Sequence, residues 1–463
     1  MIRSLLRFAK KTSLLAITLA AIAASSPAAP PAPSAAGAGN IWVLKPNFSY
    51  TQSAIAVMPF NALNASVESA TFPRIIRRDL ELSGLFKNVD DGTMQRSVMV
   101  LQRDDRNGNI AFADWNTLGV EYMLRGNLTE DGAGGFRIIV QVYDIKAKSM
   151  ILNRTFTDRK ERQRDLAHQI SDAVIYQVKG IQGVCRTKLL FVTEQMPGVR
   201  EVGVTDYDGF NAKPLTSFGK LATMPVWGAN GTEIYFQSYH TNRANIYGMQ
   251  LQTDSSMNFT PGKVWQIAGY GATNATPAWS PAAGRIVMML SKDGNTELYT
   301  TKRDGSDLQR LTETKFTEGS PSWSPDGSQV IFTSNEGGKA QLYVMSANGG
   351  GKRKLAVNGP WNDAASWSPD GKRILFASRN SGANDIFLCD VNGGNARRLT
   401  MGQGNNESPG WAPNSTHITF SSDRSGRWQI YMMLDDGSSQ NQVTANGRNI
   451  LPDWGPLVSN AQK

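Results

Sequence analysis

A Pro-x-Trp element recurs six times in the second half of the chain, and it limits the possible folds more than any other feature. Its tryptophans are spaced by 52, 44, 44, 44 and 43 residues, and alanine replaces the proline in one copy. A period of about 40–50 residues is typical of β-propellers, in which each repeat builds one blade. We expect the repeated tryptophans to pack between blades and to serve structure rather than catalysis. They are Trp227, Trp279, Trp323, Trp367, Trp411 and Trp454.

Each copy of the repeat continues with the same order of turns and strands. In the third copy, a Ser-Pro-Asp-Gly turn at residues 324–327 leads to an alternating strand at 330–334, and another strand follows at 341–345. An Asn-Gly turn at residues 348–349 then precedes a short fourth strand. Asp-Gly and Asn-Gly pairs favour hairpins. One period therefore predicts four antiparallel strands, which make one blade.

The sixth tryptophan is not followed by enough residues for a complete blade. Residues 188–193, 200–205 and 213–216 have the pattern of the second, third and fourth strands of a blade, but no Pro-x-Trp element precedes them. We therefore predict that residues 452–456 complete this blade. Pairing of the two ends of the propeller in this way leaves no open strand edge and gives six blades.

The residues before the propeller have a mixed pattern of strands and helices. An apolar strand is expected at residues 54–58, followed by a helix whose apolar stripe stops near Gly84. Three strands are expected between residues 121 and 156, and a final helix at 162–178. The predicted fold class is therefore a small N-terminal α/β domain at residues 39–183, a six-bladed β-propeller at 184–457, and a short tail at 458–463.

The first 38 residues resemble a secretory signal peptide. Four basic residues precede an apolar run from Leu14 to Ala24, which is too short to span a bilayer and is followed by prolines and small residues. We expect cleavage between residues 24 and 38 and export to the periplasm. Removing the four basic residues leaves a formal charge of +5 instead of +9. Because this charge is spread over a large surface, we expect no nucleic-acid partner.

The sequence shows no recognisable catalytic or cofactor-binding pattern. It has three histidines without metal-ligand spacing, no phosphate-binding glycine loop and no nucleophile elbow. We therefore predict no catalytic residue, no metal and no cofactor. Two alternatives stay open: a secreted propeller enzyme with its site in the central channel, and calcium at Asp-Gly turns such as Asp326-Gly327. Cys185 and Cys389 are expected to be buried, unpaired thiols.

One position of the repeat is polar in almost every copy. The third residue before the repeat proline lies in the loop that enters each inner strand, at a mouth of the channel, where an exposed ring of amides could bind a partner. Asparagine also suits loop backbone geometry on its own, so both interpretations stay open. The position is alanine in the remaining copy, Ala222. The polar members are Asn274, Glu318, Asn362, Asn406 and Asn449.

Four segments outside the repeat, residues 79–86, 118–120, 180–183 and 205–209, resemble segments of the TolB family of Tol-Pal system proteins. The order of signal peptide, α/β domain and six blades is also similar. The resemblance implies a periplasmic, non-enzymatic scaffold without a cofactor, which supports outer-membrane integrity and envelope constriction during cell division. It implies that the propeller binds the peptidoglycan-associated lipoprotein Pal, for which we select the polar ring. Further outer-membrane proteins and bacteriocins stay open as partners.

The same resemblance places the contact with the inner-membrane protein TolA on the first residues after signal cleavage. This segment is unusually apolar. It could add a strand to a partner sheet, or it could be the first strand of the α/β domain. Its residues are Ile41, Trp42, Val43, Leu44 and Lys45.

Overall fold

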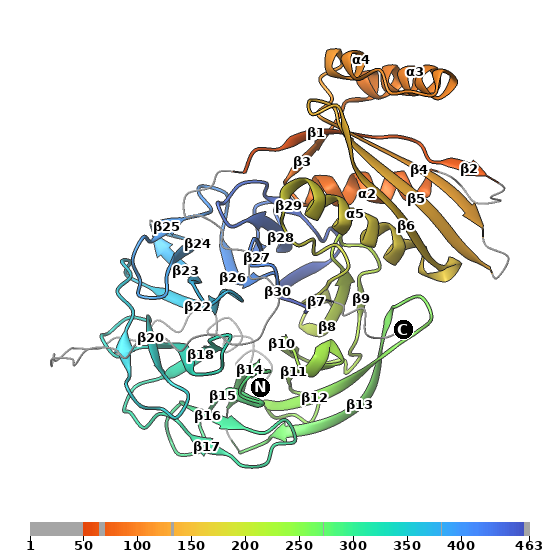
Figure 1. The fold of residues 1–463 in the computed structure, drawn as a ribbon. Helices are drawn as coiled ribbons and strands as arrows, with labels where there is room; N and C mark the ends of the chain where they lie inside the picture. Colours follow the sequence, from red (N-terminus) through yellow and green to blue (C-terminus); the bar gives the residue numbers. More distant parts are fainter. Residues whose placement is uncertain (1–49, 64–69, 131–133, 272, 381, 458–463) are drawn as a thin grey trace.

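The computed structural model describes residues 50–63, 70–130, 134–271, 273–380 and 382–457. The expected signal peptide, the expected TolA segment and the tail at 458–463 lie outside these residues. The described chain forms an α/β domain and a six-bladed propeller, as predicted, and the two domains pack against each other (Figure 1). Within the described ranges, no helix combines the length and apolar character that crossing a membrane requires.

The α/β domain is one mixed sheet with helices on both faces. Its strand order is β3-β1-β4-β5-β6, with β2 also paired to β4, and β1 runs parallel to both of its neighbours. The strands are β1 (Ser53–Val57), β2 (Asn61–Leu63), β3 (Phe86–Asn88), β4 (Tyr122–Glu130), β5 (Gly135–Asp144) and β6 (Ser149–Arg159). The helices are α2 (Thr71–Leu82), α3 (Asp91–Asn107), α4 (Phe112–Thr117), the 3-10 turn η1 (Lys160–Arg162) and α5 (Gln163–Lys179).

Alternation along β1 places the two helical layers on opposite faces of the sheet. Ile55 and Val57 are fully buried in a cluster with residues of α2 and α5, whereas Ala56 and Met58 are buried in a cluster with α3 and α4. In Figure 1, α2 and α5 lie between the sheet and the propeller, and α3 and α4 lie on the outer side. The layer that contains α2 and α5 therefore carries the contacts to the propeller.

Five blades are formed by consecutive strands, whose first strands lie around the centre of the ring in Figure 1. They are β10–β13 (Ala222–Trp227, Glu233–Ser238, Asn245–Thr253, Phe259–Ala268), β14–β17 (Asn274–Ser280, Arg285–Leu290, Glu297–Thr301, Gln309–Arg310), β18–β21 (Glu318–Trp323, Gln329–Ser334, Gln341–Ser346, Arg353–Lys354), β22–β25 (Asn362–Trp367, Arg373–Asn380, Ala383–Asp390, Arg397–Arg398) and β26–β29 (Asn406–Trp411, His417–Ser422, Gln429–Leu434, Asn441–Gln442). A 3-10 turn, η2 (Ala229–Gly231), joins β10 to β11.

The sixth sheet combines strands from both ends of the propeller. It has the order β30-β7-β8-β9, in which β30 (Arg448–Trp454) pairs antiparallel with β7 (Lys188–Met196). Its outer strands are β8 (Val199–Asp206) and β9 (Lys213–Pro214). The indole Nε1 of Trp454 donates to Thr187 Oγ1 at 2.7 Å, immediately before β7. The final strand is thus held by backbone pairing and by a buried side-chain hydrogen bond.

The repeated tryptophans lie between blades, as their spacing predicted. Five of the six are no more than 9% exposed, and Trp279 is half-buried. Trp323 Nε1 donates to the carbonyl of Ala278 at 3.2 Å, and Trp411 Nε1 donates to the carbonyl of Ser366 at the same distance. In each case the acceptor is the middle residue of the preceding blade's repeat element. The element therefore joins neighbouring blades as well as filling the space between them.

Other sequence expectations concern small features of the propeller. Cys185 and Cys389 are buried and unpaired, as predicted. In the turn at Asp326, the carboxylate accepts hydrogen bonds from the hydroxyl groups of Ser324 and Ser328 and from the backbone N–H of Ser328. This bonding is the ordinary chemistry of an Asx turn and uses both carboxylate oxygens.

Candidate functional site

The position of the polar ring follows from the blade topology. In a four-stranded antiparallel blade, the loop between the second and third strands lies at the same end as the start of the first strand. We call this end of the propeller the mouth face; it consists of the second-to-third-strand loops and of the loops that enter each first strand. The opposite end, with the first-to-second and third-to-fourth loops, is the base face. Asn274, Glu318, Asn362 and Asn406 each begin a first strand at the mouth face.

The expectation that the polar ring is exposed is wrong. Asn274, Glu318, Asn362 and Asn406 are 0% exposed, and Asn449 is 2% exposed. The reason is that these side chains point between blades instead of out of the channel. A position in the repeat identifies which residues are equivalent, but it does not reveal the direction in which their side chains point.

The asparagines of the ring tie each blade to the one before it. Their Nδ2 groups donate to polar residues at or near the start of the preceding blade's third strand. The bonds are Asn362 to Gln341 Oε1 at 3.1 Å, Asn406 to Asp385 Oδ1 at 3.2 Å and Asn449 to Gln429 Oε1 at 2.9 Å. Asn274 donates to the nearby carbonyl of Ala244 at 2.7 Å. These hydrogen bonds therefore hold the ends of the mouth-face loops in place.

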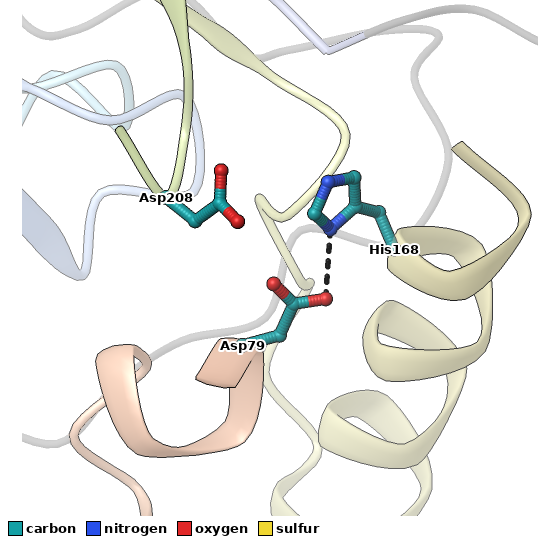
Figure 2. Close-up of side chains that lie close together, drawn as sticks. All are labelled: Asp79, His168 and Asp208. Carbon is teal, nitrogen blue, oxygen red and sulfur yellow. Dashed lines mark hydrogen bonds and ion pairs between the residues drawn. The ribbon is translucent and has the colours of Figure 1, made fainter. Parts of the chain in front are cut away.

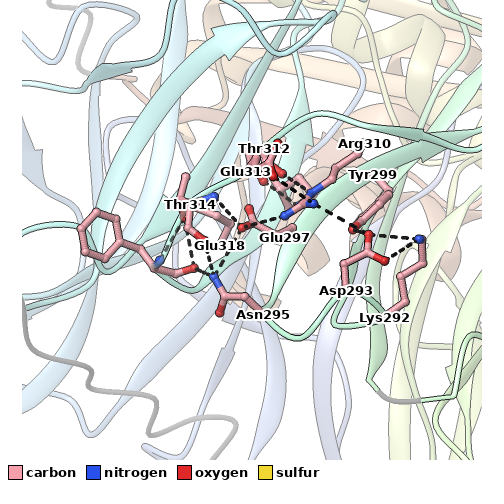
Figure 3. Close-up of polar contacts among 12 residues, drawn as sticks. Lys292, Asp293, Asn295, Glu297, Tyr299, Arg310, Thr312, Glu313, Thr314 and Glu318 are labelled. Atoms are coloured by element: carbon pink, nitrogen blue, oxygen red, sulfur yellow. Dashed lines mark hydrogen bonds and ion pairs between the residues drawn. The ribbon is translucent and has the colours of Figure 1, made fainter.

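At one blade junction, the ring residue is the acid Glu318, and it lies near a second acid, Glu297. Glu318 stands where the other blades have asparagine, and Glu297 begins the preceding third strand. Figure 3 shows Thr314 bonded to both: its N–H donates to Glu297 Oε1 at 2.6 Å and its hydroxyl donates to Glu318 Oε1 at 3.0 Å. The Oε2 atom of each glutamate is buried without a hydrogen-bond partner. Burial raises the pKa of Glu318, although Lys352 at 3.0 Å partly offsets this effect.

Replacing Glu318 with asparagine is expected to raise the free energy of unfolding by about 1 kcal/mol at pH 7, because the new amide can donate to Glu297. Lys352 keeps a partner in this variant, since its Nζ also lies 2.7 Å from Glu336. Chemical denaturation monitored by tryptophan fluorescence measures the change. The matched reversal, Asn406→Glu, sets an acid against Asp385 and should lower stability. A less stable Glu318→Asn protein contradicts this interpretation of the junction.

The side chains that the mouth face presents to solvent are different residues. Met196, Tyr270 and Met401 are 63%, 36% and 72% exposed, and each lies in or beside a mouth-face loop. Sequence reasoning missed all three. The available signal was large apolar residues within predicted loops, which are otherwise polar.

A second cluster of functional side chains lies where the α/β domain meets the propeller. Figure 2 shows Asp79 of α2, His168 of α5 and Asp208 of the propeller facing one another, and one potential ligand atom from each lies within 4.8 Å of the others. Arg164 argues against a metal ion in this cluster. Its guanidinium donates to Asp208 Oδ2 at 2.5 Å and lies 3.4 Å from His168 Nε2, so a cationic group already occupies this position. The cluster is an ion-pair network across the domain boundary.

His417 forms another contact across the boundary and is held in one tautomer. Its Nε2 donates to the carbonyl of Ser83 at 2.9 Å, while Nδ1 accepts from Asn414 Nδ2 at 3.1 Å. The residue is 2% exposed. Burial lowers the pKa of His417 to about 4, although the bond to Ser83 partly offsets this effect. The imidazole is therefore neutral at physiological pH.

The depressed pKa of His417 predicts a loss of stability in acid. Its contribution is fully present above about pH 6.5 and is lost as pH falls toward 4, because the unfolded chain binds the proton first. At pH 5 this loss amounts to about 2 kcal/mol. His417→Gln should therefore lose less stability than the wild type between pH 7.5 and pH 5, as measured by denaturant titration at both values. The control is His240→Gln in a mouth-face loop; equal losses in the wild type and His417→Gln would contradict the prediction.

Two family profiles match the chain, one for each domain. The profile described as the TolB amino-terminal domain matches residues 45–151. The profile described as the TolB beta propeller domain matches residues 176–382 and 361–460. Together the profiles cover well over half of the sequence.

Individual relatives agree with these profiles. The Tol-Pal system protein TolB of Alcanivorax borkumensis is 26% identical over 243 residues, which are 52% of this chain and 52% of that protein. The Tol-Pal system protein TolB of Rickettsia peacockii is 27% identical over 247 residues, which are 52% of this chain and 53% of that protein. The chain thus spans about half the length of the curated relatives it matches.

A solved structure matches over a longer range. The crystal structure of TolB from Acinetobacter baumannii superposes with a TM-score of 0.73 and 25% identity, over 88% of this chain and 97% of that chain. A match of this extent includes residues of both domains. The chain belongs to the TolB family.

Proposed function

We propose that this chain is the periplasmic scaffold subunit of a Tol-Pal system, which binds Pal through the mouth face and TolA through the residues that precede β1. Family membership in both domains supports a role in the Tol-Pal system and favours a scaffold over an enzyme. In this role the protein supports outer-membrane integrity and envelope constriction during division. The propeller provides a rigid surface, and the α/β domain is joined to it by a continuous buried cluster.

The observation that carries the Pal assignment is the exposure of large apolar side chains on the mouth face. Tyr270 and Met401 lie in loops between successive blades, each of which leads into a buried ring asparagine, and Met196 ends β7 beside the loop to β8. Apolar side chains on a rigid rim are typical of the centre of a protein interface. The buried ring itself then acts indirectly in Pal binding, through the loop positions that it maintains.

Calorimetric titration with the Pal protein of the same organism tests this assignment. Met401→Glu and Tyr270→Glu are each expected to weaken binding at least about tenfold, because a charge replaces an apolar contact. Met99→Glu is the matched control, since Met99 is 69% exposed but lies on α3 in the α/β domain. Unchanged affinity in both mouth-face variants would exclude the mouth face as the Pal site.

The TolA assignment has a separate test. Deletion of residues 39–45 is expected to abolish capture of TolA in a pull-down assay while leaving Pal affinity unchanged. If this segment instead forms a strand of the α/β domain, its deletion should lower the unfolding temperature and leave TolA capture in place.

A further inference from the structure

The loops of the two propeller faces carry opposite net charge. Counted between the strand bounds, the mouth-face loops contain seven lysines and arginines against four acids, and the base-face loops contain eight acids against four lysines and arginines. The net formal charges are therefore +3 and −4. The loops of the two faces therefore differ in the sign of their net charge.

The positive charge of the mouth face is accessible to a partner. Among the described loop residues, six exposed cations surround this end of the channel, whereas only Asp293 and Glu313 are exposed acids. Lys292 pairs with Asp293 at 2.8 Å. The other five make no ion pair with an acid within the described chain. The six are Lys220, Arg243, Lys292, Lys315, Lys339 and Arg427.

The described loops of the base face have no such excess of exposed positive charge. Its exposed acids Asp254, Asp304, Asp307 and Asp326 are accompanied by the exposed cations Lys302, Arg303 and Lys372. Part of this face also contacts the α/β domain, where Asp208 pairs with Arg164 and Asp436 accepts from the N–H of Tyr50. Charges of this kind mainly raise the rate of association and orient the encounter, whereas apolar contacts hold the complex together. The mouth face offers both, since Met196, Tyr270 and Met401 lie among its cations.

We infer that the mouth face docks an acidic protein surface with an apolar centre, and that its ring of cations selects this end of the propeller during encounter. This inference rests on the proposed function, because Pal is the protein that we assign to this face. Beyond that function, the inference specifies the surface of the partner, which should carry carboxylates around an apolar patch. It also predicts a strong dependence of the association rate on salt, since the charges involved are exposed.

Stopped-flow association with labelled Pal at 50, 150 and 300 mM NaCl tests the inference. The triple variant Lys315→Glu, Lys339→Glu, Arg427→Glu is expected to associate about tenfold more slowly than the wild type at 50 mM salt, with the difference shrinking as salt rises. The matched control is Lys302→Glu, Lys372→Glu, which changes exposed lysines of the base face and should leave the rate within about twofold. Thermal unfolding of each variant verifies that the propeller is intact.

A fluorescein-labelled peptide of alternating glutamate and leucine serves as a second probe. Weaker peptide binding to the triple variant than to the base-face control supports the inference, even if Pal does not bind. Absence of Pal binding to the wild type, with peptide binding still sensitive to the triple variant, would contradict the proposed function alone. If Pal binds but neither probe distinguishes the triple variant from the control, the inference is overturned and the proposed function stands.

Discussion

Replacing Trp454 with alanine is expected to lower the free energy of unfolding by about 3–5 kcal/mol, the usual range for removing a buried tryptophan. Trp454 is 6% exposed and packs against Tyr207 and His417, with ring centroids 6.3 Å away in both cases. The variant also loses the hydrogen bond to Thr187. Because Trp454 belongs to the strand that pairs with β7, its loss should weaken the junction between the two ends of the propeller. Guanidinium denaturation followed by circular dichroism measures this change.

The equivalent substitution at Trp279 provides the matched control. Trp279 occupies the same position of the repeat, but it is half-buried and its indole N–H has no hydrogen-bond partner. Trp279→Ala should therefore cost clearly less stability than Trp454→Ala. If the two variants lose equal stability, the repeat position alone sets the cost and the closing strand has no special role.

The blades were predictable because the repeat contains several independent signals in phase. The tryptophans give the period, the Asp-Gly and Asn-Gly turns give the hairpins, and the alternating segments give the strands. The pattern does not reveal the backbone inside each first strand. The residue before each repeat proline or alanine has a positive φ of 46° to 54°, and the strand register shifts there in every blade. None of these residues is glycine, so the usual signal for a left-handed backbone is missing.

Helices α3 and α4 were not predicted, because the apolar pattern that marks an amphipathic helix is weak there. The buried residues of α3 are Thr93, Ser97 and Asp104, which are all polar. Its capping signals were nevertheless present in the sequence. Asp90 accepts the N–H of Thr93 at 2.9 Å at the start of the helix, and Gly108 ends it with a φ of 71°. Capping residues would have located this helix where periodicity did not.

The burial of the polar ring could have been predicted from the sequence, but only by comparing two positions of the repeat instead of one. A second set of polar residues recurs at or near the start of the third strands, and Gln341, Asp385 and Gln429 are the partners that hold the ring asparagines. Two polar positions in phase predict a hydrogen-bonded pair between blades. Contacts across the domain boundary had no comparable signal, because Ser83 and His417 are 334 residues apart and lie in unrelated patterns.

Replacing His168 with alanine is expected to lower the free energy of unfolding by about 3–5 kcal/mol, because it leaves a buried carboxylate without its main partner. His168 Nδ1 lies 2.8 Å from Asp79 Oδ2, and the two residues are 4% and 0% exposed. Only the hydroxyl of Ser171, at 2.7 Å, would then remain to satisfy that oxygen. Because Asp208 of the propeller belongs to the same cluster, the variant should loosen the docking of the α/β domain. Limited proteolysis at the domain boundary detects this loosening.

The same pair predicts a stability loss at alkaline pH. Burial opposes protonation of His168, but the Asp79 carboxylate outweighs it and raises the pKa of His168 above 6.5; burial also raises the pKa of Asp79 itself. Among the other charged neighbours, Asp208 favours the protonated imidazole and Arg164 opposes it. The contribution of His168 is therefore fully present below pH 6.5 and is lost as pH rises through its raised pKa.

His168→Asn separates the charge of this imidazole from its hydrogen bond. The asparagine Nδ2 can replace Nδ1 as a donor to Asp79, but it does not titrate. The variant should therefore retain more stability than His168→Ala and should lose less of it than the wild type between pH 6.5 and pH 9. The acid loss assigned to His417 should remain in both variants, because that histidine has its own partners and its pKa moves in the opposite direction. Parallel curves for the wild type and His168→Asn above pH 6.5 would show that the proton on His168 does not contribute to the domain contact.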